Sequence, residues 1–268
     1  MDARVEDSAV GSPSGRPLRA LVVEADPDYA VSVKAIAEAA SLDVTVAQSA
    51  EEGMEALARN RFELVVLAVG QHDDVGALLA DIHDISPSGV VILDEALGIA
   101  REAYDSGADQ VLPKPFVPGH LAGAMRAALR TRGPESIVAV ASTIRVGDVE
   151  FNSDRRELRW DDDFRVRFSA REWELLSVLL ANTNRFFSAR ELRSLAWDDE
   201  HLGLDQVRGY VHRVRRKLEA HPLPCRLVNS RGLGYCLRVA PESTRPTAFP
   251  PPALGHRPAG ERPALAVR

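Results

Sequence analysis

The 268-residue chain holds only two cysteines and three lysines. It also lacks any apolar run of the roughly 18 residues that a membrane-spanning helix needs, and its first 17 residues contain no apolar signal segment. We therefore expect a cytoplasmic protein, in which Cys225 and Cys236 remain free thiols under reducing conditions. Both cysteines lie in short β-prone runs where they could face each other, so a redox switch is a minor alternative.

Charge is unevenly distributed along the chain. Residues 1–141 hold 22 acidic and 11 basic side chains, whereas residues 142–240 hold 15 acidic and 18 basic ones. An acidic half joined to a basic half is typical of a regulatory module attached to a nucleic-acid reader, and only the basic half should bind DNA. The sequence contains no nucleophile paired with a base, no metal-ligand cluster and no phosphate-binding loop. We therefore expect neither an enzyme nor a protein that carries a metal or another cofactor.

The acidic half alternates short apolar runs with amphipathic segments. This alternation predicts a doubly wound parallel sheet with helices on its faces, flavodoxin-like in strand order. Glu24 and Asp26 follow the first strand, at the edge where ligands usually bind in such folds. The expected strands are 18–23, 42–47, 62–69, 90–93 and 110–112, and the expected helices are 29–40, 50–60, 100–106 and 117–131.

The most informative run of the basic half is LDQVRGYVHRVRRKL, residues 204–218. Its apolar residues recur at helical spacing and predict one buried stripe, made of Val207, Val211, Val214 and Leu218. The other side of the helix is basic, which suits a DNA groove, and it carries Arg208, Gly209, His212, Arg213 and Arg216. Gly209 costs roughly 1 kcal/mol of helix propensity relative to alanine, which indicates a close approach to the backbone there. A solvated basic helix packed on a core is the plain alternative.

A second basic element follows this helix. In VNSRGLGYCL, residues 228–237, two β-prone runs flank Ser230-Arg231-Gly232, a pattern typical of a hairpin with arginine at its tip. A basic helix followed by a basic hairpin predicts a winged helix. In that arrangement the helix enters a major groove, and the wing reaches toward the backbone or the minor groove.

The basic half resembles the DNA-binding domain of the OmpR/PhoB family of response regulators. The motifs RFFSAREL, Trp197, VRGYVHRVRRKL and SRGLGYCL occur in that family's order and spacing. FSAREWELLSVLL resembles the first helix of the same domain, which follows a small antiparallel sheet. The acidic half resembles a receiver domain, so the resemblance covers nearly the whole chain. It implies a sequence-specific transcriptional regulator of a two-component system, formed from an α/β receiver and an α+β winged helix-turn-helix domain.

Composition and resemblance together divide the chain into five segments. The receiver-like domain is expected at 18–132 and the winged-helix domain at 142–240, joined by a linker at 133–141. Residues 1–17 are small and polar, and residues 241–268 contain seven prolines. Both end segments are expected to be disordered because they bury too little apolar surface to fold.

The receiver resemblance implies a phosphorylation pocket, and this chain departs from it. A receiver uses an acceptor aspartate, two carboxylates that hold Mg²⁺, a hydroxyl and a lysine. Here the acceptor position holds Ala68, whose methyl group cannot attack phosphorus. The other pocket positions hold Glu24, then Ala25 with the second acid displaced to Asp26, then Asp94 in place of the hydroxyl residue, and the retained Lys114.

We expect Asp94 to pair with Lys114 and to replace the phosphate permanently, which would make regulation independent of phosphorylation. The plain alternative is that Lys114 only caps the strand or extends to solvent. Two alternatives remain open: the pocket senses a small ligand, or a relocated acceptor such as Asp73 or Asp74 takes part in a phosphorelay. An unspecific architectural DNA protein is disfavoured by the shortage of lysine and the net charge of −6.

The resemblance also implies roles on DNA. Arg208, His212 and Arg213 are expected to face the major groove, and Arg215 and Arg216 to contact phosphates. Tyr210 is expected to donate to a phosphate oxygen. Wing residues complete the expected DNA-binding set with Asn229 and Arg231, the latter entering a minor groove.

The expected partners are promoter DNA with direct repeats and a second copy of the chain. The homodimer is expected to form through the receiver domain, and RNA polymerase is a further candidate partner. On the last receiver helix, the apolar stripe of Ala122, Met125, Ala128 and Leu129 offers part of a dimer face or packs on the sheet.

Overall fold

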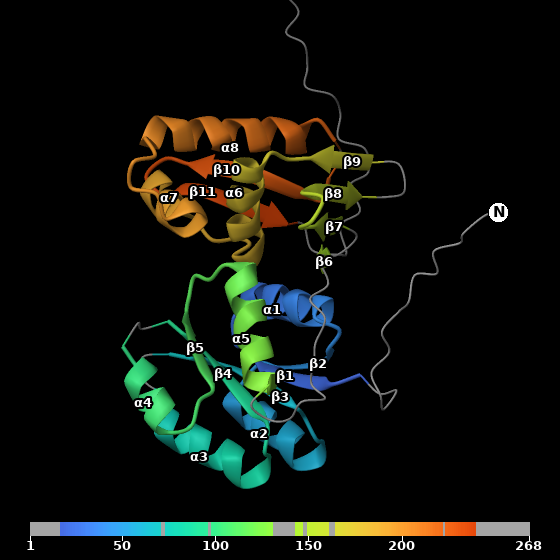
Figure 1. The fold of residues 1–268 in the computed structure, drawn as a ribbon, viewed down its shortest axis with the longest axis vertical. Coiled ribbons are helices and arrows are strands. Elements are labelled where there is room, and N and C mark those ends of the chain that lie inside the picture. The colour runs from blue at the N-terminus through green and yellow to red at the C-terminus, as the bar shows by residue number, and fades with distance from the viewer. Residues whose placement is uncertain are drawn as a thin grey trace, which may run out of the picture.

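The computed structural model describes residues 17–70, 73–95, 98–130, 143–146, 149–160, 164–221 and 223–239. The expected linker at 133–141 and the expected tail at 241–268 lie outside these residues, as does nearly all of the expected disordered N-terminus. The described elements form two domains, which lie one above the other in Figure 1. Among the described residues, no helix is long and apolar enough to cross a membrane.

The first domain is built on a five-stranded parallel sheet in the order β2-β1-β3-β4-β5. This is the flavodoxin-like order expected from the sequence. The strands are β1 (Arg19–Val23), β2 (Asp43–Ala47), β3 (Leu64–Val69), β4 (Gly89–Asp94) and β5 (Gln110–Pro113). The helices are α1 (Pro27–Ala39), α2 (Ala50–Arg59), α3 (Val75–Ile85), α4 (Ala100–Asp105) and α5 (Pro118–Arg130).

Alternation along the strands divides the first domain into two cores. On β1, Ala20 and Val22 pack with residues of α1 and α5, whereas Leu21 and Val23 pack with residues of α2 and α3. The same alternation continues in β3 and β4, because successive side chains of a strand point to opposite faces of a sheet. Helices therefore cover both faces, as Figure 1 shows, and the three central strands β1, β3 and β4 are largely buried, whereas the edge strands β2 and β5 are partly exposed.

Each strand and helix expected in the first half is present, with bounds within two residues of the expected ones. Helix α3 is an addition, because the sequence reading left the stretch between the third and fourth strands unassigned. A signal for it exists: Asp74 caps the helix by accepting a hydrogen bond from the Ala77 N–H, and Val75, Leu79 and Ile82 form a buried stripe.

The second domain begins with a four-stranded antiparallel sheet in the order β6-β7-β8-β9. Three helices follow, and a two-stranded hairpin closes the domain. The strands are β6 (Thr143–Val146), β7 (Val149–Asn152), β8 (Glu157–Trp160) and β9 (Phe164–Arg167), with β10 (Cys225–Ser230) and β11 (Gly234–Val239) in the hairpin. The helices are α6 (Ala170–Ala181), α7 (Ala189–Trp197) and α8 (Leu204–Glu219). This is the winged-helix arrangement that the sequence predicts.

Capping fixes where two of these helices begin. Ser169 and Glu172 form a capping box at the start of α6, and Ser188 and Glu191 form another at the start of α7. In each box the serine accepts from a backbone N–H of the first turn and the glutamate accepts from the serine N–H. The buried faces of α6 and α8 then meet in one apolar core that also includes the inner residues of β10 and β11.

The wing turns sharply at two glycines with positive φ. Gly232 has φ +85° and Gly234 has φ +101°. An added Cβ at Gly232 would meet open space, whereas one at Gly234 would lie 2.1 Å from the backbone oxygen of Phe187. Phe187 and Tyr235 also exchange backbone hydrogen bonds of 2.8 Å, so the segment before α7 packs directly against the wing.

Because the two glycines have different surroundings, we expect their replacement by alanine to lower the stability of the second domain by different amounts. Gly232→Ala should destabilise the second domain by about 1–2 kcal/mol, because only the left-handed backbone is penalised. Gly234→Ala should cost roughly 1–3 kcal/mol more, because the methyl group forces β11 away from Phe187. Chemical denaturation followed by tryptophan fluorescence measures both values. Equal costs for the two variants would contradict the packing of the wing on Phe187.

Candidate nucleic-acid interface and receiver pocket

The receiver pocket, which we define as Glu24, Asp26, Asp94 and Lys114, lies where the strands of the first domain end. Glu24 directly follows β1, Asp94 ends β4, and Lys114 directly follows β5. Because parallel strands present their carboxyl ends at one edge of a sheet, these residues converge there. Glu24, Asp94 and Lys114 are all buried.

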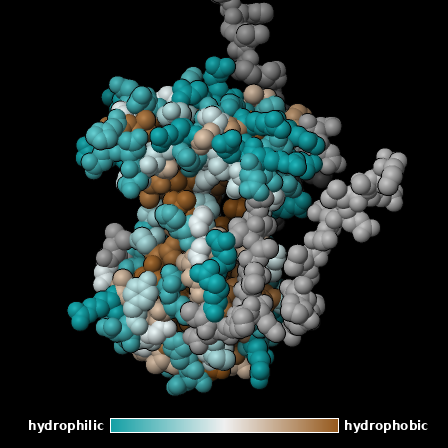
Figure 2. Space-filling model, viewed as in Figure 1, coloured by the Kyte–Doolittle hydropathy of each residue, from teal (hydrophilic) through white to brown (hydrophobic). Residues whose placement is uncertain are grey.

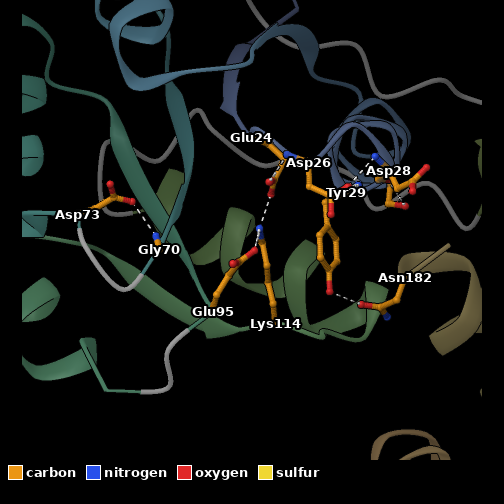
Figure 3. A network of polar contacts seen from close by, with 10 residues as sticks. Glu24, Asp26, Asp28, Tyr29, Gly70, Asp73, Glu95, Lys114 and Asn182 are labelled. Carbon is orange, nitrogen blue, oxygen red and sulfur yellow. Dashed lines mark hydrogen bonds and ion pairs between the residues drawn. The ribbon is translucent and has the colours of Figure 1, made fainter. Parts of the chain in front are cut away.

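Lys114 is ion-paired with two glutamates (Figure 3). Its ammonium lies 2.6 Å from a Glu24 carboxylate oxygen and 3.0 Å from Glu95 Oε1. The side chains of Lys114 and Glu24 are only 2% and 3% exposed, whereas that of Glu95 is 48% exposed. Burying a charge without a partner is very unfavourable, so Glu24 is the main compensation for Lys114.

These ion pairs correct the expected pairing of Lys114 with Asp94. Glu95, one residue further along, takes the place expected for Asp94. The Asp94 carboxylate faces the following loop instead and accepts a long hydrogen bond of 3.5 Å from the Ile99 N–H. Asp94 and Lys114 still meet through the backbone, because the Lys114 N–H donates to the Asp94 carbonyl over 2.8 Å.

The remaining acids near this edge have backbone partners. Asp26 caps α1 by accepting from the N–H groups of Asp28 and Tyr29. Asp73 accepts a 2.7 Å hydrogen bond from the Gly70 N–H, just beyond β3 (Figure 3). Ala68 lies in β3 beside Leu93 of β4 and is partly buried. Among the described residues, no group of three or more histidine, cysteine or acidic side chains is arranged to hold a metal ion.

Helix α8 buries the expected stripe and exposes the expected basic face. Val207, Val211, Val214 and Leu218 are buried. On the opposite side the exposed members are Arg208, His212, Arg213 and Arg216, which we call the basic face. The end of the molecule that carries α8 is covered mainly by hydrophilic residues in Figure 2. A row of cations on an exposed helix is suited to the phosphate-lined groove of DNA.

The buried carboxylate of Glu172, on α6, forms ion pairs with two cations of α8. Its carboxylate is 4% exposed and lies 2.7 Å from Lys217 Nζ and 3.5 Å from Arg213 Nε. Burial alone would raise the pKa of the Glu172 carboxyl, but the hydrogen bonds from Lys217 and from the Ser169 N–H outweigh burial and lower that pKa. Glu172 therefore stays ionised, and it contacts the Nε atom of the Arg213 guanidinium while half of that side chain remains exposed.

Two positions on α8 behave differently from the sequence expectation. Arg215 is partly buried, and its Nε donates to the Leu227 carbonyl of β10 over 3.0 Å. This contact joins the helix to the wing and differs from the expected phosphate contact. Gly209 provides space beside a side chain, since an added Cβ would lie 3.4 Å from Arg213 Nη1. Arg213 in turn lies over the Tyr210 ring, 4.4 Å from its centroid, and Tyr210 packs on Trp197.

The wing presents its tip to solvent. Arg231 is exposed at the turn, and Asn229 is exposed near the end of β10. Leu233, beside them, is 59% exposed, which is unusual for a large apolar side chain. The structure thus places the expected wing residues on the surface of the second domain.

The two cysteines do not lie opposite each other, which corrects the sequence expectation. In the wing register Cys225 pairs with Val239, and Cys236 pairs with Val228. Both are free and buried. Burial raises the pKa of Cys225 to about 12 and also raises that of Cys236, where Arg238 partly opposes it.

The apolar stripe of α5 is part of the core. Ala122, Met125, Ala128 and Leu129 are each at most 8% exposed and pack with α1 and the sheet. Of the two uses expected for this stripe, packing on the sheet is the correct one. A dimer face on the first domain would need other residues.

Comparison with known proteins identifies the chain. Residues 163–237 match the family model described as "Transcriptional regulatory protein, C terminal". The chain is 30% identical over 239 residues to the transcriptional regulatory protein PrrA of Mycobacterium tuberculosis, and the match covers 87% of this chain and 99% of that protein. The chain belongs to the OmpR/PhoB family of response regulators. It is accordingly a DNA-binding transcriptional regulator and not an enzyme.

Other relatives of this OmpR/PhoB-family regulator span nearly the same length. It is 29% identical over 230 residues to the response regulator MprA of Mycolicibacterium vanbaalenii, covering 84% of this chain and 99% of that one. The solved structure of DrrB, an OmpR/PhoB homologue from Thermotoga maritima, shares 19% identity. That match covers 83% of this chain and 100% of the other, with a TM-score of 0.36.

Two residues of this regulator were missed from the sequence. The Ser169-to-Glu172 spacing signals a capping box, but nothing in the spacing shows that Glu172 also holds Lys217 and Arg213. Glu95 was overlooked because it adjoins Asp94, and two adjacent acids at the end of a strand cannot be ranked as ion-pair partners from the sequence alone.

The thiol environment predicts inert cysteines. With the pKa of Cys225 near 12, the protonated form dominates at pH 8, so iodoacetamide should modify neither cysteine in the native protein. Both should react fully in guanidinium, which serves as the internal control. Intact mass spectrometry measures the number of modified thiols. A disulfide-linked native protein, or fast native labelling, would contradict this picture of the wing core.

Proposed function

We propose that this response regulator binds promoter DNA sequence-specifically through α8 and the wing, without phosphorylation of its first domain. The observation that carries the proposal is the closed ion pair between Lys114 and Glu24. A lysine at this position in a receiver binds the phosphoryl group on the acceptor. Here the same ammonium is buried and already compensated by a carboxylate of the chain.

The acceptor side supports the same proposal. Ala68, which aligns with the acceptor aspartate, carries no nucleophile. The two nearby candidates for a relocated acceptor already accept hydrogen bonds from the backbone. Asp73 accepts from the Gly70 N–H, and Asp74 caps α3 by accepting from the Ala77 N–H. A phosphoryl group on either carboxylate would have to compete with these hydrogen bonds.

On DNA, we assign the exposed polar side chains of α8 and the wing to two tasks. Arg208, His212 and Arg213 lie toward the expected groove side of α8 and suit base edges. Arg216 and Arg231 suit phosphates or the minor groove, and Arg215 supports the wing through Leu227. Binding as a homodimer to direct repeats, with RNA polymerase as a further partner, is part of the proposal by analogy with the family.

The first test separates base reading from phosphate contact. A preferred site is first selected from random-sequence DNA. Arg213→Ala should then cost about 1–3 kcal/mol on that site and little on random DNA. Arg216→Ala should weaken both alike and reduce the salt slope of the binding constant by about one. Titrations monitored by fluorescence anisotropy at several salt concentrations measure these effects.

Arg61→Ala, which removes an exposed arginine of the first domain, is the matched control and should leave both affinities unchanged. Equal loss of specific and random binding in the Arg213 and Arg216 variants would show that the division of tasks is wrong. Full retention of affinity in both would remove α8 as the reading helix.

The second test addresses phosphorylation. Incubation with acetyl phosphate and Mg²⁺ should give no phosphoryl adduct by intact mass and should leave DNA affinity unchanged, because Ala68 offers no acceptor oxygen. A response regulator with an acceptor aspartate, treated in parallel, shows that the donor is active. An adduct that disappears in Asp73→Asn or Asp74→Asn would instead establish a relocated acceptor.

A further inference from the structure

The first and second domains meet at a junction centred on Tyr29, a residue of α1 that is 1% exposed. The Tyr29 hydroxyl donates a 3.2 Å hydrogen bond to Oδ1 of Asn182, which ends α6 in the second domain (Figure 3). Burial raises the pKa of Tyr29, although Arg185 opposes this, so the phenol keeps its proton and remains a donor. One directional contact therefore joins the receiver's first helix to the first helix of the DNA-binding domain.

Asn182 connects the two domains through both ends of its amide. Besides accepting from Tyr29, its Nδ2 donates to the Phe116 carbonyl of the first domain over 2.9 Å and to the Val178 carbonyl over 2.7 Å. Asn182 is 1% exposed, and each of its amide atoms is satisfied. A buried side chain amide with every group bonded accepts only one geometry, because losing a partner leaves a costly unpaired polar atom.

Further contacts surround this amide. Asn184 Nδ2 donates to Asp28 Oδ1 over 2.7 Å, and Ser32 Oγ lies 3.4 Å from the Leu180 carbonyl. Apolar packing is shared as well, since Ala35 of α1 joins the core of the second domain and Ala181 of α6 joins that of the first. The cavity that remains between α1 and α6 is about 30 Å³, enough for one or two water molecules and far smaller than a metabolite site.

The junction also touches the receiver pocket. Lys114 Nζ lies 4.5 Å from the centroid of the Tyr29 ring, and Arg185 Cζ of the second domain lies 4.7 Å from the same centroid. Tyr29 thus contacts the pocket cation, the guanidinium of the other domain and, through its hydroxyl, Asn182. Phe116, whose carbonyl holds Asn182, is two residues beyond Lys114 and packs on the Tyr29 ring at 5.6 Å.

Docking at this junction leaves the reading helix uncovered. In Figure 1, α6 stands above α1 and α5, and α8 crosses the opposite end of the second domain. The basic face is exposed in this arrangement. The docked form is therefore compatible with DNA binding, and the junction sets the orientation in which α8 is presented.

We propose that Tyr29 and Asn182 are positioning residues that lock the winged-helix domain onto α1, and that Tyr29 transmits the state of the Lys114 ion pair to α6. The second part rests on the proposed function, because a receiver without phosphorylation needs another route from its pocket to the DNA-binding domain. A change in the receiver pocket, such as loss of the Lys114 charge, then alters the stability of the docked arrangement that orients α8.

The tryptophans supply a selective readout. Trp160, Trp173 and Trp197 all lie in the second domain, so tryptophan fluorescence follows its unfolding in the full-length chain. Tyr29→Phe removes one hydroxyl from the first domain and should lower the denaturation midpoint reported by these tryptophans. Asn182→Ala should shift the equilibrium between docked and undocked domains toward the undocked form by roughly tenfold or more. The substitution leaves the Tyr29 hydroxyl and the Phe116 carbonyl without their hydrogen-bond partner.

Tyr104→Phe is the matched control. Tyr104 is on α4, and its hydroxyl is hydrogen-bonded to the Val111 N–H within the first domain. Removing that hydroxyl should leave the tryptophan midpoint unchanged. In a double-mutant cycle, Tyr29→Phe and Asn182→Ala should be non-additive, whereas Tyr104→Phe and Asn182→Ala should be additive. An unchanged midpoint in Tyr29→Phe, or additivity of Tyr29→Phe with Asn182→Ala, would overturn the lock.

Transmission from the pocket is tested with Lys114→Met combined with Glu24→Gln, which removes both charges and leaves neither buried alone. This variant should lower the tryptophan midpoint and be non-additive with Asn182→Ala, because the contacts between described residues link Lys114 to Asn182 through Tyr29 and Phe116. Leu79→Ala, a core substitution in α3, controls for general loss of stability in the first domain. Additivity, or an equal midpoint shift from Leu79→Ala, would overturn transmission.

DNA binding is measured separately on the same proteins. If the wild type binds no selected site while the midpoints behave as expected, the proposed function fails and the lock stands. If DNA binding is intact and the midpoints do not respond, the lock fails and the proposed function stands.

Discussion

A buried ammonium group governs the carboxyl edge of the first domain. Lys114 is 2% exposed at the side chain, and an ion of that kind is tolerated only beside opposite charge. Glu24 supplies that charge from the end of β1, and Glu95 adds to it from the end of β4. Since both carboxylates belong to the chain, the charge of Lys114 is compensated without a phosphoryl group. The same ammonium lies 4.5 Å from the centroid of the Tyr29 ring, which brings the ion pair next to the domain junction.

In the second domain the signs are reversed, because a buried carboxylate is compensated there by nearby cations. One buried ion of this domain is the carboxylate of Glu172, and cations of α8 compensate it. The cations of that helix therefore fall into two groups: those that bind groups of the protein and those that are exposed to solvent. Lys217 binds Glu172, and Arg215 binds the Leu227 carbonyl. Arg216 is exposed, and Arg208 is exposed while paired with Asp205 on the same helix. Counting basic residues on a helical projection alone overstates its DNA-binding charge.

Much of the fold could be predicted from periodicity, because apolar runs and helical stripes are local properties of the sequence. The stripe of α8 and the five parallel strands are examples. The predictions that were wrong depend on strand register or on which of two adjacent residues makes a contact. Cys225 and Cys236 are offset in the hairpin by its pairing, and Glu95 rather than Asp94 meets Lys114. Helix α3 had a usable cap at Asp74, but its short apolar stripe was passed over.

The junction between the domains could not have been predicted at all from local pattern. Asn182 bonds to Tyr29 and Phe116, which are 153 and 66 residues away in the chain. The acidic first half and the basic second half would attract each other in many orientations, because Coulomb attraction is weakly directional. A neutral phenol and a neutral amide with fixed hydrogen-bond geometry select one orientation among these. Polar specificity at the junction thus keeps a basic helix from folding back onto an acidic domain and leaves it available to DNA.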